Sequence, residues 1–275
     1  MKTVLIATDF SAASFNASKY GVELASILGA QIVLFYAYKI PLIVPGSLME
    51  IDSKEFKDAA EDRLLKEVLS LRKSDFQPIE IIAYEGDPAP SIVSYSKKYK
   101  DCLIVCGMKG SSNVLKQVFG TTAISLIKLS NVPVLVIPEF SMYSTIRNVA
   151  LAYDGTFSAE DAITKWVIEI GEKSHAQFFI VTILKKVLNE VSELSYYSEK
   201  LNQDLKSLHP IYEFPRSSKI EKGLDKFIKE FKIDLLCINP HHHSLLERLF
   251  IKSETQQMIF HSHIPLLVLP EARLD

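Results

Sequence analysis

Residues 2–11 of the chain, KTVLIATDFS, have a counterpart in residues 147–156, RNVALAYDGT. Each is a short apolar run that ends in an aspartate and is followed two positions later by a small hydroxyl residue. Residues 131–139, NVPVLVIPE, and residues 263–271, HIPLLVLPE, form a second pair of matching stretches. Both ends of a unit of about 135 residues are therefore repeated, which predicts two tandem copies of one fold.

Within the first copy, apolar runs alternate with segments whose apolar residues recur at helical spacing. The runs with the composition of buried strands are residues 4–7, 31–37, 79–84, 102–107 and 133–138. The first helical segment between them begins after Ser11. The others cover roughly residues 53–72, 88–99 and 118–129. Such alternation predicts parallel strands joined by right-handed crossovers. We therefore predict an α/β protein with two doubly wound, five-stranded parallel sheets, one for each copy.

The second copy repeats this alternation after a short polar connector at about residues 139–145. Its strands are predicted to start near Val149, Gln177, Ile211, Ile233 and Pro265. The predicted domains are residues 1–140 and residues 146–275.

Composition places the chain among globular proteins with an ordinary core, because 48% of its 275 residues are hydrophobic and 23% are charged. The net charge of −2 gives no general attraction to nucleic acid or to a membrane, so we expect neither as a partner. The first residues do not have the form of a signal peptide. Cys102, Cys106 and Cys237 lie in or beside strand-like runs, and we expect reduced core thiols in a cytoplasmic protein. A redox role for Cys106 is the alternative.

A glycine-rich stretch, residues 107–122, GMKGSSNVLKQVFGTT, follows the predicted fourth strand. Ligands of doubly wound sheets bind beyond the carboxyl ends of such strands. Gly107 and Gly110 would let the loop turn tightly and expose backbone N–H groups. Gly120 to Thr122 lie near the start of the next helix, where the helix dipole favours an anion. The sequence contains no Walker loop, early dinucleotide fingerprint or nucleophile elbow. This stretch is therefore a candidate phosphate-binding loop.

The pattern Gly107-x-x-Gly110, nine residues, then Gly120-Thr121 resembles the nucleotide-binding signature of the universal stress protein family. Three other segments are similar to that family, namely ATDFS at residues 7–11, EGDPAPSI at residues 85–92 and VPVLVIP at residues 132–138. The resemblance covers both copies, as in tandem members. It implies for each copy a Rossmann-like sheet of the adenine nucleotide alpha hydrolase type, with strand order 3-2-1-4-5.

The resemblance implies that the first copy binds an adenine nucleotide, either ATP with Mg²⁺ or else ADP or AMP. Asp9, preceded by Thr8, would contact the ribose or the adenine, and Ala37 would meet the adenine through its backbone. Cys106 and Gly107 would border the sugar. The residues implied to hold phosphates are Gly110, Ser111, Gly120, Thr121 and Thr122. Ala37 and Cys106 are smaller than the apolar residues usual in the family. No catalytic residue and no protein ligand to a metal is expected.

The second copy lacks the glycines of the first. Asn239, His242 and Lys252 stand where the first copy has Gly107, Gly110 and Gly120, and Glu254 replaces Thr122. A side chain makes a left-handed backbone harder, and a carboxylate at a phosphate position opposes binding. We therefore expect the second copy not to bind nucleotide in the family's way.

The loop of the second copy also holds the triplet His241, His242 and His243. The sequence leaves open whether these imidazoles bind a metal, bind an anion or only donate hydrogen bonds.

In the family, the apolar edge strands pair across a two-fold axis, which implies that residues 132–138 and 264–270 pair here within one chain. Further pairing into a homodimer, and binding of a protein partner, are left open. We expect a stress-response regulator or switch rather than a fast enzyme, because no general base other than Asp9 is evident. The alternatives are an interaction protein without nucleotide and a slow ATPase.

Overall fold

The computed structural model describes residues 1–41, 52–71, 77–108, 121–153, 164–184, 203, 205–238 and 264–270. Several predictions concern residues outside these ranges. They are the predictions for the phosphate loop of the first copy (Gly110, Ser111 and Gly120), for the triplet His241 to His243, and for the second-copy positions that replace glycine or threonine (Asn239, His242, Lys252 and Glu254).

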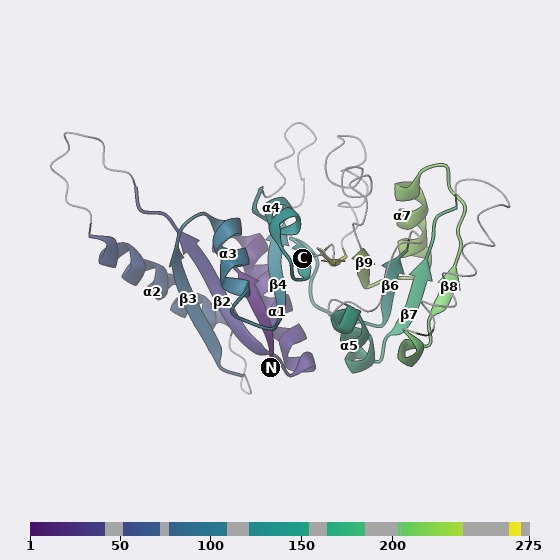
Figure 1. Ribbon diagram of the computed structural model, residues 1–275, viewed down its shortest axis with the longest axis horizontal. Coiled ribbons are helices and arrows are strands. Elements are labelled where there is room, and N and C mark those ends of the chain that lie inside the picture. Colours follow the sequence, from purple (N-terminus) through teal and green to yellow (C-terminus); the bar gives the residue numbers. More distant parts are fainter. Residues whose placement is uncertain are drawn as a thin grey trace.

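The first half alternates strands and helices as the apolar pattern predicted (Figure 1). Its elements are β1 (Lys2–Ala7), α1 (Ala12–Leu28), β2 (Gln31–Tyr38), α2 (Ser53–Leu71), β3 (Ile79–Glu85), α3 (Pro88–Ser96), β4 (Asp101–Met108), α4 (Thr121–Leu129) and β5 (Val134–Pro138). Helix α1 begins after Ser11, whose side chain accepts a hydrogen bond from the amide of Ser14. It ends at Gly29, which has the left-handed φ of 62° that is typical of a helix C-cap.

The described strands of the second half follow the same arrangement in the sheet as those of the first. Its described elements are β6 (Asn148–Ala152), α5 (Thr164–Ser174), β7 (Gln177–Val181), a 3-10 turn η1 (Lys206–Leu208), β8 (Ile211–Glu213), α7 (Ile220–Glu230), β9 (Leu235–Ile238) and β10 (Leu266–Val268). Among the helices that the structure describes, none has both the length and the apolar character that a bilayer crossing requires.

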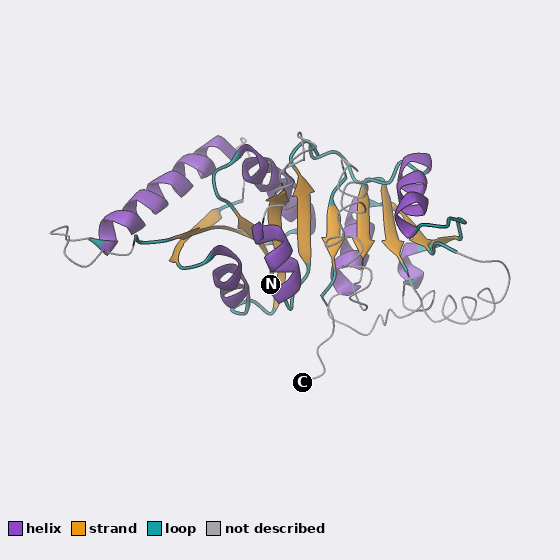
Figure 2. Cartoon of the chain, turned by 90° about the horizontal axis from the view of Figure 1, so that it is seen from above, coloured by secondary structure: helices purple, strands orange, loops and turns teal. Residues whose placement is uncertain are grey.

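The ten strands in the described residues form one sheet, in the order β3-β2-β1-β4-β5-β10-β9-β6-β7-β8. Each half has the predicted order 3-2-1-4-5, and its strands are parallel. The halves meet where β5 and β10 pair in antiparallel fashion, with Leu135 opposite Leu267. The predicted pairing of the two apolar edges within one chain is therefore confirmed. Helices cover both faces of this sheet (Figure 2).

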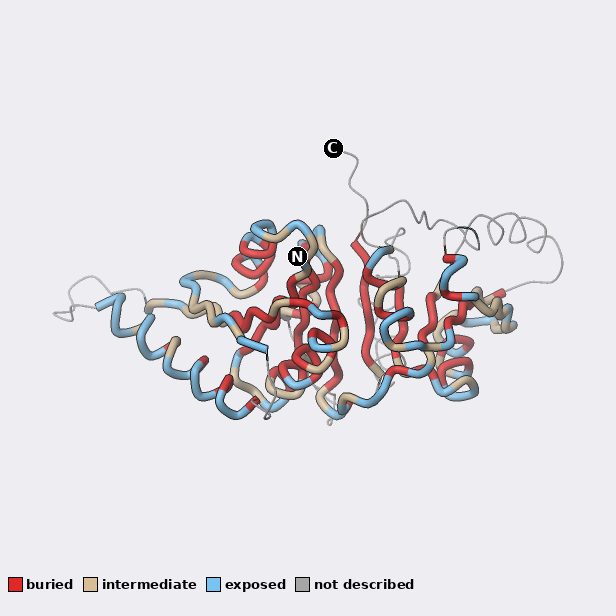
Figure 3. Tube along the Cα trace, turned by 90° about the horizontal axis from the view of Figure 1, so that it is seen from below, coloured by how far each residue is buried: buried red, intermediate tan, exposed pale blue. Residues whose placement is uncertain are grey.

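Strand residues alternate between two cores, one on each face of the sheet. In β1, Val4 and Ile6 belong to one cluster, whereas Leu5 and Ala7 belong to the other. Buried residues accordingly follow the strands, while helix α2 at the outer end of the first half is largely exposed (Figure 3).

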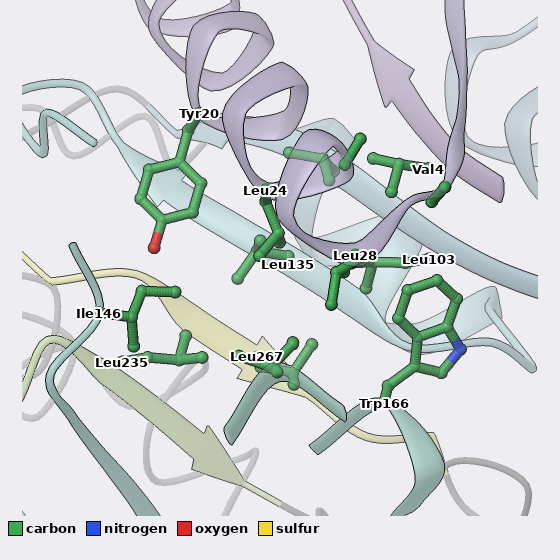
Figure 4. Packing of buried hydrophobic residues seen from close by; sticks show 14 of the residues in the cluster. Val4, Tyr20, Leu24, Leu28, Leu103, Leu135, Ile146, Trp166, Leu235 and Leu267 are labelled. Atoms are coloured by element: carbon green, nitrogen blue, oxygen red, sulfur yellow. The ribbon is translucent and has the colours of Figure 1, made fainter. Parts of the chain in front are cut away.

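The core that contains α1 continues from the first half into the second. Figure 4 shows Leu24 and Leu135 of the first half gathered close to Leu235 and Leu267 of the second. An ion pair between Lys2 and Glu169 also links β1 to α5. The two halves therefore share apolar burial, which is the main favourable term in folding.

Candidate nucleotide site

A cavity of about 490 Å³ lies at the carboxyl ends of β1, β2 and β4. The predicted site residues that line it are Thr8, Asp9, Ala37, Cys106, Gly107 and Thr122. Thr121 is the first residue of α4, next to Thr122. The structure thus brings together residues from segments that are far apart in the sequence.

Sheet topology explains why these residues meet. Strand β1 lies between β2 and β4, and Ala7 at its end is in register with Phe35 on one side and Cys106 on the other. The chain leaves β1 and β4 at this same edge, and the strand order reverses between them, which is where doubly wound sheets bind ligands.

Three helices begin at the cavity. Residues that line it include Ser14 in the first turn of α1, Pro88 at the start of α3, and Thr122 and Ala123 at the start of α4. Helix N-termini carry a partial positive charge and present backbone N–H groups. The convergence of three such ends favours an anionic group in this cavity.

Hydrogen bonds fix the turn between β1 and α1. The Thr8 hydroxyl lies 3.2 Å from Ser14 Oγ and accepts from the Phe10 amide at 3.0 Å. The Ser11 amide donates to Asp9 Oδ1 at 3.0 Å. Phe10 itself has a φ of 63°, a left-handed conformation that is unusual for a bulky side chain. This backbone conformation costs of order 1–3 kcal/mol of conformational free energy, so the surrounding hydrogen bonds must stabilise the turn.

Glycine is required at position 107 for a reason other than the predicted one. It lies inside β4, paired with Ile137, and not in the loop that follows the strand. A β-carbon at this position would lie 2.5 Å from the Ala13 carbonyl oxygen and 2.8 Å from the Ser14 nitrogen. Glycine is therefore needed here because the backbone of α1 passes directly over β4.

Comparison with known proteins identifies the family of this fold and site. The model of the universal stress protein family matches residues 1–138, which is half of the chain. The chain belongs to the universal stress protein family. A universal stress protein of Methanocaldococcus jannaschii is 30% identical over 142 residues, covering 50% of this chain and 82% of that relative.

Full-length relatives show that this is a tandem universal stress protein. A universal stress protein of Synechocystis sp. is 24% identical, with 97% of this chain and 99% of that protein covered. The crystal structure of a universal stress protein from Archaeoglobus fulgidus covers 98% of both chains with a TM-score of 0.75 and 19% identity. A Pseudomonas aeruginosa PAO1 protein, described as functionally unknown, has a TM-score of 0.57 at 11% identity. The two structural matches bear on the fold alone.

The cysteines of this universal stress protein are free and buried, as predicted. Burial raises the pKa of the Cys102 and Cys106 thiols to about 12, and it also raises the pKa of Cys237. The reactive form of cysteine is the thiolate. Although Cys106 lines the cavity, its raised pKa therefore argues against the redox alternative.

Carboxylates are sparse in the described wall of the cavity, where Asp9 is the one that lines it. Within the described ranges, no three His, Cys, Asp or Glu side chains are grouped so that they could hold a metal ion.

Sequence reasoning missed Glu67, whose carboxylate accepts a hydrogen bond from Thr8 in the wall of the cavity. The sequence of α2 contains a pattern that could have identified Glu67 as a buried residue. The buried positions Ala60, Leu64 and Leu71 repeat at intervals of four and seven residues, and Glu67 occupies the position between them on the apolar stripe. A carboxylate in such a stripe indicates a buried polar partner.

Proposed function

We propose that the first half of this universal stress protein binds one adenine nucleotide, ATP with Mg²⁺, in the cavity at the ends of β1, β2 and β4. The observation that carries the proposal is the convergence of Asp9, Ala37, Cys106 and Thr122 on that cavity. The resemblance to the family implies a role at the nucleotide for each of these residues. The cavity volume of about 490 Å³ lies within the range of small-molecule sites.

The lining residues fit an adenine nucleotide chemically. Asp9 supplies a carboxylate for the ribose or the adenine, and Ala37 offers an apolar surface and backbone groups at the end of β2. Thr121 and Thr122 at the start of α4 would meet the phosphates, together with Gly110, Ser111 and Gly120 from the preceding loop. When bound, Mg²⁺ would offset the negative charge of the phosphates.

The function that best matches this site is regulation by a bound nucleotide rather than rapid catalysis. A hydrolase needs a group that activates water beside the γ-phosphate. In the described wall, the only carboxylate is that of Asp9, and its Oδ1 already accepts from the Ser11 amide. We infer a cytoplasmic stress-response protein in which the bound nucleotide changes shape or partner affinity.

The second half completes the sheet and, we propose, binds no nucleotide. Strand β10 occupies the edge of β5, so this edge is not available to a second copy. A homodimer would therefore have to form through another surface. The strands at the ends of the described sheet are β3 and β8.

The direct test is the nucleotide stoichiometry of the purified full chain. Isothermal titration with ATP and Mg²⁺ should give one nucleotide per chain, and Asp9→Ala should weaken binding by about 10- to 150-fold, as expected for the loss of a charged hydrogen bond worth about 1.5–3 kcal/mol. No retention at millimolar ATP would favour the interaction protein without nucleotide. Steady release of ADP or AMP would favour the ATPase.

A further inference from the structure

The side chain of Glu67 is unusually placed for a carboxylate. It is only 6% exposed, although glutamate is seldom buried unless it is paired. Its partners are hydroxyls, since Oε2 accepts from Thr8 Oγ1 at 2.8 Å and Oε1 accepts from Ser18 Oγ at 2.7 Å. Thr8 precedes the turn into α1, and Ser18 lies within α1. Glu67 of α2 therefore joins both parts of the element that forms one wall of the cavity.

Thr8 transmits this contact to the turn. Its hydroxyl donates to Glu67 and accepts from the Phe10 amide at 3.0 Å. With its single hydrogen used by Glu67, the hydroxyl has no hydrogen left to donate to a ligand. Thr8 therefore acts on the cavity through the turn that it holds, which carries Asp9.

A second residue of α2 contacts the same turn. Arg63 precedes Glu67 by four positions, so both lie on one face of the helix. Its guanidinium lies 3.9 Å from the centre of the Phe10 ring and 5.5 Å from that of Tyr36. The left-handed Phe10 is thus held at its amide by Thr8 and at its ring by Arg63.

We infer that Glu67 is a positioning residue of the nucleotide site, which acts through Thr8 to fix the turn that presents Asp9. This inference rests on the proposed function of the cavity. Electrostatics alone would not place a carboxylate there, because a negative charge close behind an anion site opposes binding. Its hydrogen bonds to Thr8 and Ser18 supply the reason for its presence.

Two substitutions separate the charge of Glu67 from its geometry. In Glu67→Gln, the side-chain oxygen accepts from Thr8 and the amide donates to Ser18, whose hydroxyl turns to the Ser14 carbonyl, already 3.0 Å away. In Glu67→Met, a side chain of similar length remains, but both hydroxyls lose this acceptor. Removal of the charge alone should leave the affinity for ATP unchanged or raise it, whereas loss of positioning should lower it.

The experiment measures ATP affinity by titration calorimetry in the full chain. We expect Glu67→Met to bind about tenfold more weakly than the wild type, corresponding to about 1.4 kcal/mol. Glu67→Gln should bind within about threefold of the wild type or more tightly, because its side-chain oxygen still accepts from Thr8. Val68→Ala is the matched control, because Val68 is a buried neighbour on α2 whose side chain has no atom that could hydrogen-bond to Thr8 or Ser18. Equal losses in Glu67→Met and Val68→Ala would overturn the inference.

Amide hydrogen exchange of the free protein tests the inference without any nucleotide. The Phe10 amide should exchange about tenfold faster in Glu67→Met than in the wild type, relative to amides of β2, because its acceptor Thr8 is no longer held. In Glu67→Gln and Val68→Ala it should keep the protection of the wild type. A wild type that binds no ATP would overturn the proposed function, whereas unchanged Phe10 exchange in Glu67→Met would overturn the positioning role.

Discussion

Leu135 of β5 lies directly opposite Leu267 of β10, and both side chains are fully buried. The pair sits where the two halves of the chain join into one sheet. Residues of the same apolar cluster extend from this pair into both halves. Neither half covers the outer edge of its last strand alone, because the strand that pairs with this edge comes from the other half.

Leu267→Ala is expected to destabilise the whole chain and not only its second half. Replacing a buried leucine by alanine typically costs about 2–5 kcal/mol, since apolar contact is lost and a cavity remains. Urea unfolding followed by circular dichroism should show one transition, shifted to lower urea.

The control is Leu129→Ala, the same substitution at the end of α4, where the leucine side chain is 45% exposed. It should alter the free energy of unfolding by much less than Leu267→Ala. Two separate transitions in Leu267→Ala, with that of the first half unmoved, would contradict the shared core.

Gly107→Ala should destabilise the fold by about 1–3 kcal/mol, as overpacking of a filled site does. The new β-carbon would meet backbone atoms of Ala13 and Ser14, which side-chain rotation does not move. Gly21→Ala offers a contrast, because its β-carbon would meet the end of the Ile6 side chain at 2.9 Å. Ile6→Val removes the atom nearest to this β-carbon, so the double variant should be more stable than Gly21→Ala alone. Thermal unfolding compares the stability of these variants with that of the wild type. A Gly107→Ala variant as stable as the wild type would contradict the close contact between α1 and β4.

Stability should fall in alkaline solution because of the buried thiols. Burial raises the pKa of Cys102 and Cys106 from 9.0 to about 12. The folded state thus keeps both protons between these values, whereas the unfolded state releases them above pH 9. Their contribution is fully present below pH 9 and is lost as the pH rises toward about 12, by about 1.4 kcal/mol per pH unit for each thiol.

The measurement is urea unfolding at pH 8, 9 and 10 for the wild type and for Cys102→Ala with Cys106→Ala. The double variant should start from a lower free energy of unfolding, because it has lost buried atoms, but should decline less steeply with pH. Parallel declines in the two proteins would assign the alkaline loss to other groups, such as Tyr20, whose pKa burial also raises.

The strands followed from the sequence because their signals are local, since apolar runs define strands. The pairing of residues 131–139 with residues 263–271 was implied by the resemblance to the family, whose edge strands pair across a two-fold axis. The positions of Asp9 and Gly107 at one sheet edge followed from topology, since carboxyl ends of parallel strands share an edge. Ala37 and Cys106 were expected beside them only because of the resemblance to universal stress proteins.

What the sequence did not predict depends on contacts between distant segments. The bond between Thr8 and Glu67 joins residues 59 positions apart, and nothing near either residue specifies the other. The need for glycine at position 107 likewise comes from the path of α1 across β4. The left-handed Phe10 is maintained by Thr8 and Arg63, so its conformation is set by tertiary structure rather than by propensity.

Exchanging single residues between the two copies tests why only the first is proposed to bind ATP. Gly120→Lys introduces the residue of the second copy and should abolish measurable binding, because a side chain would replace the open backbone expected at the phosphates. Lys252→Gly makes the reverse change and should leave the stoichiometry at one, since Asn239, His242 and Glu254 still differ from the first copy. Titration calorimetry with ATP and Mg²⁺ measures both. A second bound nucleotide in the wild type or in Lys252→Gly would show that the second copy has kept a usable site.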